Sequence, residues 1–470
     1  FASETKALLA SMPKQPAVDA VALHQVMNYR YVRGERTMWE GIKRLLPGHS
    51  IYWQDGHLKL EQYWEPPASN DGSTPTTQEL SELLEDAVAE HLVSDVPVAS
   101  FISGGLDSTA ISSWAKPHLE FPMKSFCLGF GTRHDETAHA KMASGKLGLE
   151  FHPIQMRPTD FENLDKVIWH LDEPIGDAIA VATYILASEA SQHSKVVLTG
   201  EGADEIFGGY DTYAADQLAR RLATVVPKGA VSMLAGLVGL LPASERKKGL
   251  LNKVKRFVQG IADEPEDIAH YRWMAFLPVA AKQALYTPEL QTSLFQSDVY
   301  RPIRESLGSA GTDDLLHRQL YADLCVYLAD DILVKVDRMS MATSLETRAP
   351  FLDVNLMELA YSIPSELKIR NGERKYILKQ ALRDVLPTGI LRRPKEGFSI
   401  PMKNWLRGDL APIMRDLLAP ERIGQRGWFS PVAVTRLIDS HLSGRDNHAH
   451  VLFSLMVLER WAESVLDETV

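Results

Sequence analysis

The fold of this chain is decided by the stretch Ser103-Gly104-Gly105-Leu106-Asp107-Ser108. An apolar run at residues 96–102, typical of a buried strand, leads into it, and residues 108–116 have the pattern of a helix. Glycines at such a turn let the backbone approach a phosphate, and the free N–H groups at the helix start favour an anion. The serine hydroxyls can donate hydrogen bonds, and Asp107 can hold Mg²⁺ beside the phosphates. We therefore expect a pyrophosphate-binding loop, with an ordinary glycine turn as the alternative.

This loop is not the P-loop of kinases. No Gly-x-x-x-x-Gly-Lys-Ser/Thr motif occurs in the sequence, so kinase-like use of the γ-phosphate is not indicated. The loop instead resembles the pyrophosphate loop of N-type ATP pyrophosphatases. Those enzymes cleave ATP between the α- and β-phosphates and adenylate a substrate.

The bulk composition narrows the function classes. At 470 residues the chain is long enough for two to four domains. A net charge of −11 argues against a general nucleic-acid binder. The two cysteines, Cys127 and Cys325, make no disulfide framework and fit a reducing cytoplasm. The most apolar window, residues 230–242, falls well short of the roughly 20 residues that cross a bilayer, so we expect no membrane partner.

The chain divides into three parts by its patterns. Residues 1–65 look like the end of a β-rich domain, with a hairpin formed by residues 48–53 and 58–64. A Pro-, Ser- and Gly-containing stretch at residues 66–77 is typical of a linker. A second domain, residues 78–470, opens with an amphipathic helix at about residues 77–92.

Strand and helix patterns alternate in the first half of the second domain. Strands are predicted at residues 96–102, 123–130, 150–156 and 195–199. Helices are predicted at residues 108–116, 136–147, 159–170 and 180–193. This alternation predicts a parallel sheet covered by helices on both faces, with ligands beyond the carboxyl ends of the strands. From about residue 206 onward we expect helices with no strand rhythm.

A second polar loop follows the last predicted strand. After Thr199 comes Gly200-Glu201-Gly202-Ala203-Asp204-Glu205. Three carboxylates so close together repel one another, and a cation would relieve that repulsion. Asp204 could complete a Mg²⁺ site with Asp107, because Mg²⁺ commonly takes one or two carboxylates plus phosphate oxygens. The alternative is a helix N-terminus that carries acidic residues for stability.

Longer stretches resemble the synthetase domain of glutamine-dependent asparagine synthetases, in order, from Phe1 to about residue 461. The matching motifs lie at residues 93–97, 103–108, 125–130, 172–177, 200–210, 330–341, 346–353, 375–379 and 393–398. The resemblance implies an α/β fold. It comprises a parallel-sheet N-type ATP pyrophosphatase (PP-loop, adenine nucleotide alpha hydrolase-like) domain with a helical C-terminal part. The β-rich end of an Ntn-type glutaminase domain precedes it.

The resemblance also implies a ligase reaction with ATP and Mg²⁺. Aspartate is adenylated to β-aspartyl-AMP with release of pyrophosphate, and ammonia then attacks to give asparagine. Asp107 and Asp204 would bind Mg²⁺, Glu201 would support adenylate formation and ammonia attack, and Lys395 would neutralise charge on the α-phosphoryl transition state. The implied nucleotide contacts are Ile102, Ser103, Gly104, Gly105, Leu106, Asp107, Ser108, Leu128, Thr199 and Gly200.

Other charged residues have more than one interpretation. Lys395 without the resemblance would be a solvated residue of a basic loop, and Lys375 is a candidate second phosphate contact. Asp331 and Lys335 stand at helical i,i+4 spacing. We interpret them, with their charged neighbours Asp330, Asp337 and Arg338, as a structural ion-pair network, and keep Lys335 and Asp337 near the site as the alternative.

Complete members of this family begin with a glutaminase domain whose first residue is a cysteine. Residues 1–9 resemble a segment late in that domain, so we expect the catalytic cysteine to be absent from this chain. Cys127 and Cys325 are predicted to be small core residues. The chain as given is therefore expected to make amide from free ammonia and not to hydrolyse glutamine.

The acyl acceptor is the open question at this stage. Related enzymes with a different carboxylate substrate are polysaccharide-linked amidotransferases, β-lactam synthetases and lasso-peptide cyclases. The expected partners are small molecules: ATP, L-aspartate, and ammonia or L-glutamine. We expect no nucleic acid, leave a homodimer open, and expect a cytoplasmic location.

Overall fold

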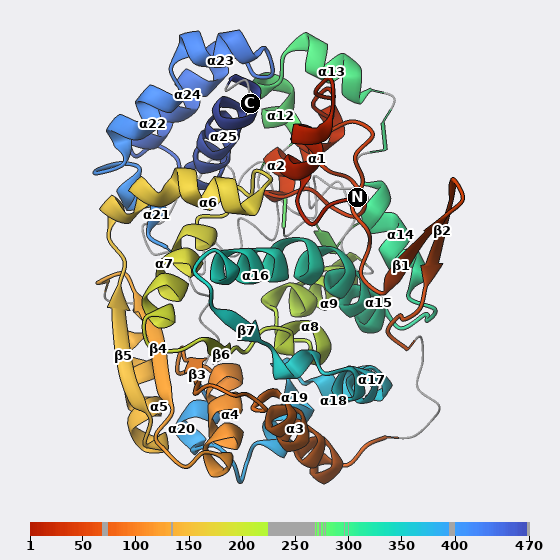
Figure 1. Cartoon of the computed structure of the whole chain (residues 1–470), viewed down its shortest axis with the longest axis vertical. Coiled ribbons are helices and arrows are strands. Elements are labelled where there is room, and N and C mark those ends of the chain that lie inside the picture. The colour runs from red at the N-terminus through yellow and green to blue at the C-terminus, as the bar shows by residue number, and fades with distance from the viewer. Residues whose placement is uncertain are drawn as a thin grey trace.

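The computed structural model describes residues 1–67, 74–132, 135–223, 279–295, 297–298, 300–393 and 400–467, with residues 268, 270, 271, 274, 275 and 277 between them (Figure 1). The apolar window at residues 230–242 and Lys395 lie outside this set. Within it, no helix is both long and apolar enough to cross a membrane.

A five-stranded parallel sheet organises the second domain. Its strands are β3 (Val98–Phe101), β4 (Lys124–Gly129), β5 (Glu150–Gln155), β6 (Val196–Leu198) and β7 (Glu346–Arg348), in the order β5-β4-β3-β6-β7. All four pairings are parallel, and Ser100 of β3 lies opposite Ser125 of β4 and Leu198 of β6. The four strands predicted from the alternation are confirmed. The expectation of no strand after residue 206 is wrong, because β7 adds to the edge of the sheet beside β6.

Helices cover both faces of this sheet (Figure 1). On one face Val98, Cys127 and Val196 pack in a core with α3 (Thr77–His91), α4 (Leu106–Ala115) and α5 (Thr137–Leu147). On the other face the sheet packs against α7 (Ile179–Ser191), which in turn contacts α16 (Leu333–Met341). The helices predicted in this region are confirmed, except that the one at residues 159–170 divides into a 3-10 turn, Pro158–Asn163, and α6 (Leu164–Leu171).

The first 65 residues contain two helices before the predicted hairpin. The hairpin is present as β1 (His49–Gln54) and β2 (His57–Gln62), and its strand residues are largely exposed. Helices α1 (Thr5–Ser11) and α2 (Ala20–Tyr29) were not predicted from the sequence. Asp19 starts α2 by accepting hydrogen bonds from two main-chain N–H groups, and nearly all of this helix is buried.

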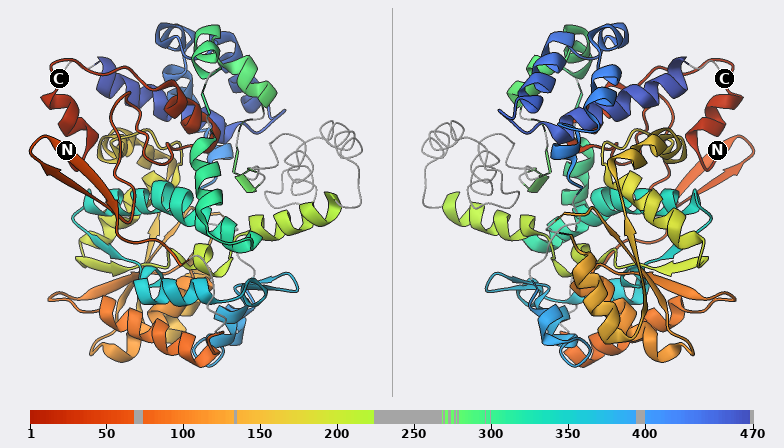
Figure 2. Two further views of the ribbon diagram at one scale, coloured as in Figure 1. Left: turned by 90° about the vertical axis from the view of Figure 1, so that its right-hand side faces the viewer. Right: turned by 90° about the vertical axis from the view of Figure 1, so that its left-hand side faces the viewer.

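A helical layer joins this N-terminal part to the C-terminal end. Helix α2 packs on α25 (Ala449–Ala462), which also contacts α6 and α22 (Ala411–Leu417). The two ends of the chain lie on the same side of the molecule (Figure 2). Further helices in the described residues are α8 (Ala203–Phe207), α9 (Asp211–Ala223), α12 (Val279–Leu285), α13 (Pro288–Leu294), α14 (Arg301–Ser309), α15 (Leu315–Asp323), a π-helical segment (Leu324–Ile332), α17 (Val354–Ser362), α18 (Ser365–Lys368), α19 (Tyr376–Ala381), α20 (Thr388–Leu391), α21 (Met402–Trp405), α23 (Pro420–Arg426) and α24 (Pro431–Leu442). A small hairpin, β8 (Ile369–Arg370) with β9 (Glu373–Arg374), precedes α19.

Candidate active site

The loop between β3 and α4 folds back onto the start of its own helix. The Ser103 N–H donates to the Ser108 hydroxyl at 3.1 Å, and the Gly105 N–H donates to the Ser103 hydroxyl at 3.1 Å. Gly104 has φ +67°, and a Cβ there would lie 2.5 Å from the backbone of His139, so this position requires glycine. Among the described residues no side chain caps the helix at Gly105. The first turn of α4 therefore presents main-chain N–H groups that suit an anion.

The second polar loop lies directly against this turn. β6 is the sheet neighbour of β3, so Thr199 and Gly200 emerge beside the loop that begins at Ser103. A Cβ on Gly200 would lie 3.0 Å from the Ser108 nitrogen and 3.3 Å from the Asp107 Cβ. The parallel sheet thus brings together two loops that are almost 100 residues apart in the sequence.

A lysine bridges the two candidate metal ligands. The Lys375 Nζ lies 2.6 Å from the Asp107 Oδ1 and 2.6 Å from the Asp204 Oδ1. Lys375 is buried at the N-terminus of α19 in a left-handed conformation, with φ +52°. Burial disfavours its charge, but Asp107 and Asp204 outweigh this effect and hold the pKa of Lys375 above its usual value.

The three clustered carboxylates have different surroundings. Asp204 faces Lys375, whereas Glu205 is buried and accepts a hydrogen bond from the Tyr210 hydroxyl. The Oε2 of Glu201 is buried without a hydrogen-bond partner in the described part of the chain. Burial raises the pKa of the Glu201 carboxyl against the opposing hydrogen bond of Thr199. Glu201 therefore has the surroundings of a carboxyl group that accepts a proton more readily than an exposed one.

The carboxylates of Asp107 and Asp204 are suitable ligands for a Mg²⁺ ion that also binds phosphate. Asp107 and Asp204 offer two carboxylates at one point, which is the number that Mg²⁺ commonly takes from a protein when phosphate oxygens complete its shell. No group of three or more His, Cys, Asp or Glu side chains that could hold a metal alone is found in the described residues.

For the remaining predicted nucleotide contacts, Ile102 and Leu128, the structure shows burial in the core. The Ile102 N–H donates to the Phe126 carbonyl at 2.9 Å, and the side chains of Ile102 and Leu128 are buried in the hydrophobic cores. Their contact with adenosine stays a prediction. Lys395 lies outside the described residues, but Arg393, two residues before it, donates to the Ser103 carbonyl at 3.2 Å. The sequence analysis did not single out Arg393, although it stands inside a motif that carried the resemblance.

The predicted ion-pair network is confirmed for Asp331 and Lys335, which lie 2.9 Å apart. Lys335 also pairs with Asp177 at 2.7 Å, and Asp177 reaches Arg30 at 3.2 Å. The network therefore joins α16 to the N-terminal part, which the sequence did not indicate.

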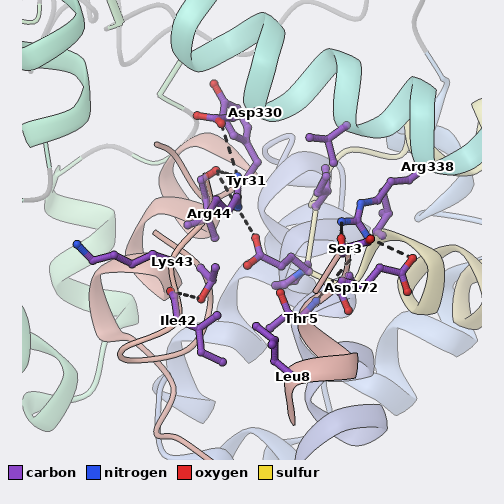
Figure 3. Close-up of a pocket in the computed structure, with 18 of the residues that line it drawn as sticks. Ser3, Thr5, Leu8, Tyr31, Ile42, Lys43, Arg44, Asp172, Asp330 and Arg338 are labelled. Atoms are coloured by element: carbon purple, nitrogen blue, oxygen red, sulfur yellow. Dashed lines mark hydrogen bonds and ion pairs between the residues drawn. The ribbon is translucent and has the colours of Figure 1, made fainter. Parts of the chain in front are cut away.

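A separate cavity of about 260 Å³ lies where the N-terminal part meets the second domain (Figure 3). Arg44 and Arg338 line it together with the carboxylates of Asp172, Glu173 and Asp330. These acids hold main-chain groups of the first 65 residues: Asp172 accepts from Lys6 at 3.0 Å, Glu173 from Met38 at 3.1 Å, and Asp330 from Gly34 at 2.7 Å. None of the predicted site residues that the structure describes lines this cavity.

Comparison with known protein families gives two matches, which together cover most of the chain. An asparagine synthase family model matches residues 79–463, and a glutamine amidotransferase domain model matches residues 1–64. The chain belongs to the asparagine synthase family. This membership supports ATP-dependent amidation as the class of reaction and ATP as a substrate.

Individual relatives cover nearly all of the chain. "Asparagine synthetase [glutamine-hydrolyzing] 1" of Bacillus subtilis (strain 168) is 31% identical over 98% of this chain and 71% of its own length. A protein of Mycobacterium tuberculosis (strain ATCC 25618 / H37Rv) is named "Putative asparagine synthetase [glutamine-hydrolyzing]". It is 31% identical over 100% of this chain and 72% of its own length. "Amidase chyE" of Penicillium rubens is 26% identical over 87% of this chain and 66% of its own length.

Proposed function

We propose that this chain adenylates the side-chain carboxylate of L-aspartate with ATP and transfers the acyl group to ammonia, which gives asparagine, AMP and pyrophosphate. The observation that carries the proposal is that the uncapped start of α4 lies beside Asp107 and Asp204, two carboxylates that share the ammonium group of Lys375. The names of the B. subtilis and M. tuberculosis relatives support aspartate as the carboxylate substrate.

In the first step the aspartate carboxylate oxygen attacks the α-phosphorus, and the bond to pyrophosphate breaks. We assign the departing pyrophosphate to the loop of Ser103 to Ser108, where the main-chain N–H groups at the start of α4 have no side-chain cap. Mg²⁺, held by Asp107 and Asp204, would supply positive charge to the phosphate oxygens. We assign Lys395 to the α-phosphoryl group, where charge develops in the transition state.

In the second step ammonia attacks the acyl carbon and AMP leaves. The nitrogen must lose a proton, and the buried Glu201 carboxylate is the proposed base. Its raised pKa makes it a stronger base than an exposed carboxylate. The buried surroundings also keep water away from the activated ester.

We further propose three parts for the chain: the end of a glutaminase domain at residues 1–65, a linker at 66–77 and the synthetase domain at 78–470. The amidotransferase match ends at residue 64 and the synthase match begins at residue 79, which supports these bounds. The ammonia for the reaction would then come from glutamine in a protein with a complete glutaminase domain.

The direct test measures pyrophosphate and asparagine in one reaction with Mg-ATP, L-aspartate and ammonium chloride. Equal amounts of the two products are expected, and Asp107→Asn should shift the Mg²⁺ dependence of pyrophosphate release to higher concentration. A folded, ATP-binding sample that releases no aspartate-dependent pyrophosphate would exclude aspartate. In that case the second candidate function is amidation of a different carboxylate. The Penicillium rubens relative, which is named an amidase, supports this alternative.

A further inference from the structure

The position of Lys375 carries an inference about how the site admits its metal, and it rests on the proposed function. The Nζ atom lies 2.6 Å from one oxygen of Asp107 and 2.6 Å from one oxygen of Asp204. A Mg²⁺ ion would bind such oxygens at about 2.0–2.1 Å. The ammonium group and the metal ion would overlap, so these two oxygens cannot hold both at once.

The surrounding backbone shows that this lysine position is built into the fold. The backbone of Lys375 has φ +52°, a left-handed conformation that residues other than glycine rarely adopt. Its side chain is only 6% exposed. Gly209 leaves the room for it, because a Cβ at Gly209 would overlap both the Asp204 carboxylate and the Lys375 Cε. Arg374, the preceding residue, fixes this approach by donating to the Gly209 carbonyl at 2.8 Å.

The charges explain why a cation is needed there before any substrate arrives. Asp107, Asp204 and Glu201 are three acids within one small region. Without a counter-charge they would repel one another strongly in a partly buried site. A covalently attached ammonium group supplies that charge at all metal concentrations.

We propose that Lys375 is the resident counter-ion of the nucleotide-free site and excludes divalent metal from the Asp107–Asp204 pair until a phosphate-bearing substrate binds. The pyrophosphate oxygens then provide a new anionic partner for the ammonium group beside the α4 N-terminus, and the two carboxylates become available to the metal. The site therefore takes metal with nucleotide and not alone.

The test measures the binding of Mn²⁺ to the protein without nucleotide. The electron paramagnetic resonance signal of free Mn²⁺ reports how much metal remains unbound. Lys375→Met removes the charge and keeps a similar length, and it is expected to bind Mn²⁺ about tenfold or more tightly than the wild type. Lys379→Met is the matched control, since Lys379 lies on the same helix and pairs with Glu373 at 3.0 Å, away from the two aspartates. It should bind Mn²⁺ as the wild type does.

A stability readout separates this proposal from a general folding defect. Mg²⁺ should raise the melting temperature of Lys375→Met and leave that of the wild type unchanged, because the variant has lost the ammonium group that lies against both carboxylates. If Lys375→Met does not fold, Lys375→Gln offers amide donors without charge and serves in the same assays. Tight Mn²⁺ binding by the nucleotide-free wild type, or no gain in the folded variants, would overturn the proposal. Neither result would affect the pyrophosphate and asparagine test, so the two claims fail separately.

Discussion

At the scale of single residues, the acids of the second loop separate into different tasks. Asp204 shares a cation with Asp107, Glu205 is turned toward Tyr210, and Glu201 keeps a buried carboxylate oxygen without a partner in the described structure. Sequence spacing alone could not distinguish them, because all three stand within five positions. These different surroundings support the proposed roles, with Glu201 as the base and Asp204 as a ligand of Mg²⁺.

Replacing Glu201 tests this separation. Glu201→Gln keeps the size of the side chain and removes the base, so ATP binding should stay close to wild type while asparagine formation falls by about 10²-fold or more. Isothermal titration with ATP and product analysis measure the two effects. Glu205→Gln is the comparison at the neighbouring acid and should not show this split. Wild-type synthesis by Glu201→Gln would remove Glu201 from the mechanism.

A buried histidine gives a prediction about stability. His270 lies between Asp216 at 2.6 Å and Asp323 at 2.9 Å, and these carboxylates outweigh burial and raise its pKa to about 10. The folded protein stabilises the protonated form of His270. The contribution of His270 to the free energy of unfolding is therefore complete below pH 6.5 and is lost as the pH rises toward 10.

The stability advantage of the wild type over His270→Gln should therefore shrink by roughly 1.4 kcal/mol per pH unit between pH 7 and pH 10. Urea unfolding at several pH values measures it. His57→Gln, in the exposed hairpin, serves as the control and should leave the pH dependence unchanged. A constant difference between wild type and His270→Gln would mean that His270 is not charged in the folded protein.

At the scale of elements, the turn from β3 into α4 sets the geometry of the site. Gly104 brings this turn against the backbone of His139 at the start of α5, so one position fixes both the loop shape and the packing of two helices. A side chain here would meet backbone atoms that cannot rotate away.

Gly104→Ala should lower the free energy of unfolding by about 1–3 kcal/mol and weaken ATP binding more than tenfold, because the strained loop would no longer aim its N–H groups. Gly145→Ala is the matched control. It stands in α5 with open space around it, and we expect it to keep ATP binding and to stabilise the protein by about 0.5–1 kcal/mol. Equal behaviour of the two variants would contradict the role given to Gly104.

The sequence predicts these elements unevenly for physical reasons. Strands β3, β4 and β6 are visible because each contains an apolar run followed by turn residues and a helix, and β5 is more polar but continues the same strand–helix alternation. Strand β7 is a polar three-residue edge, Glu346–Arg348, whose pairing depends on tertiary contacts and leaves no periodic signal. The meeting of Lys375 with Asp107 joins residues 268 positions apart, and no local pattern encodes it.

At the scale of the whole molecule, acids of the second domain hold the N-terminal part in place. Asp172, Glu173 and Asp330 each accept main-chain N–H groups from the first 65 residues around the cavity of Figure 3. Hydrogen bonds from main-chain N–H groups to carboxylates are stronger than neutral ones. The N-terminal part is therefore attached to the synthetase domain by named polar contacts in addition to apolar packing.

Asp172→Ala tests this attachment. Asp172 accepts from both Thr5 and Lys6 at the start of α1, so its loss should cost about 1–3 kcal/mol of local stability and speed hydrogen exchange of the α1 amides by about 5- to 150-fold. Asp165→Ala removes a surface ion pair with Arg460 and is the control that should leave α1 unchanged. Unchanged exchange in Asp172→Ala would show that α1 is held by its apolar contacts alone.

The central claim, activation of a carboxylate as an acyl-adenylate, is tested most directly with oxygen isotopes. The chain is incubated with Mg-ATP, ammonia and L-aspartate that carries ¹⁸O in its side-chain carboxylate, and the mass of the nucleotide product is measured. The account predicts AMP with one ¹⁸O atom, because a carboxylate oxygen bonds to the α-phosphorus and stays with it when ammonia attacks. Unlabelled AMP during asparagine formation, or ADP as the nucleotide product, would contradict it.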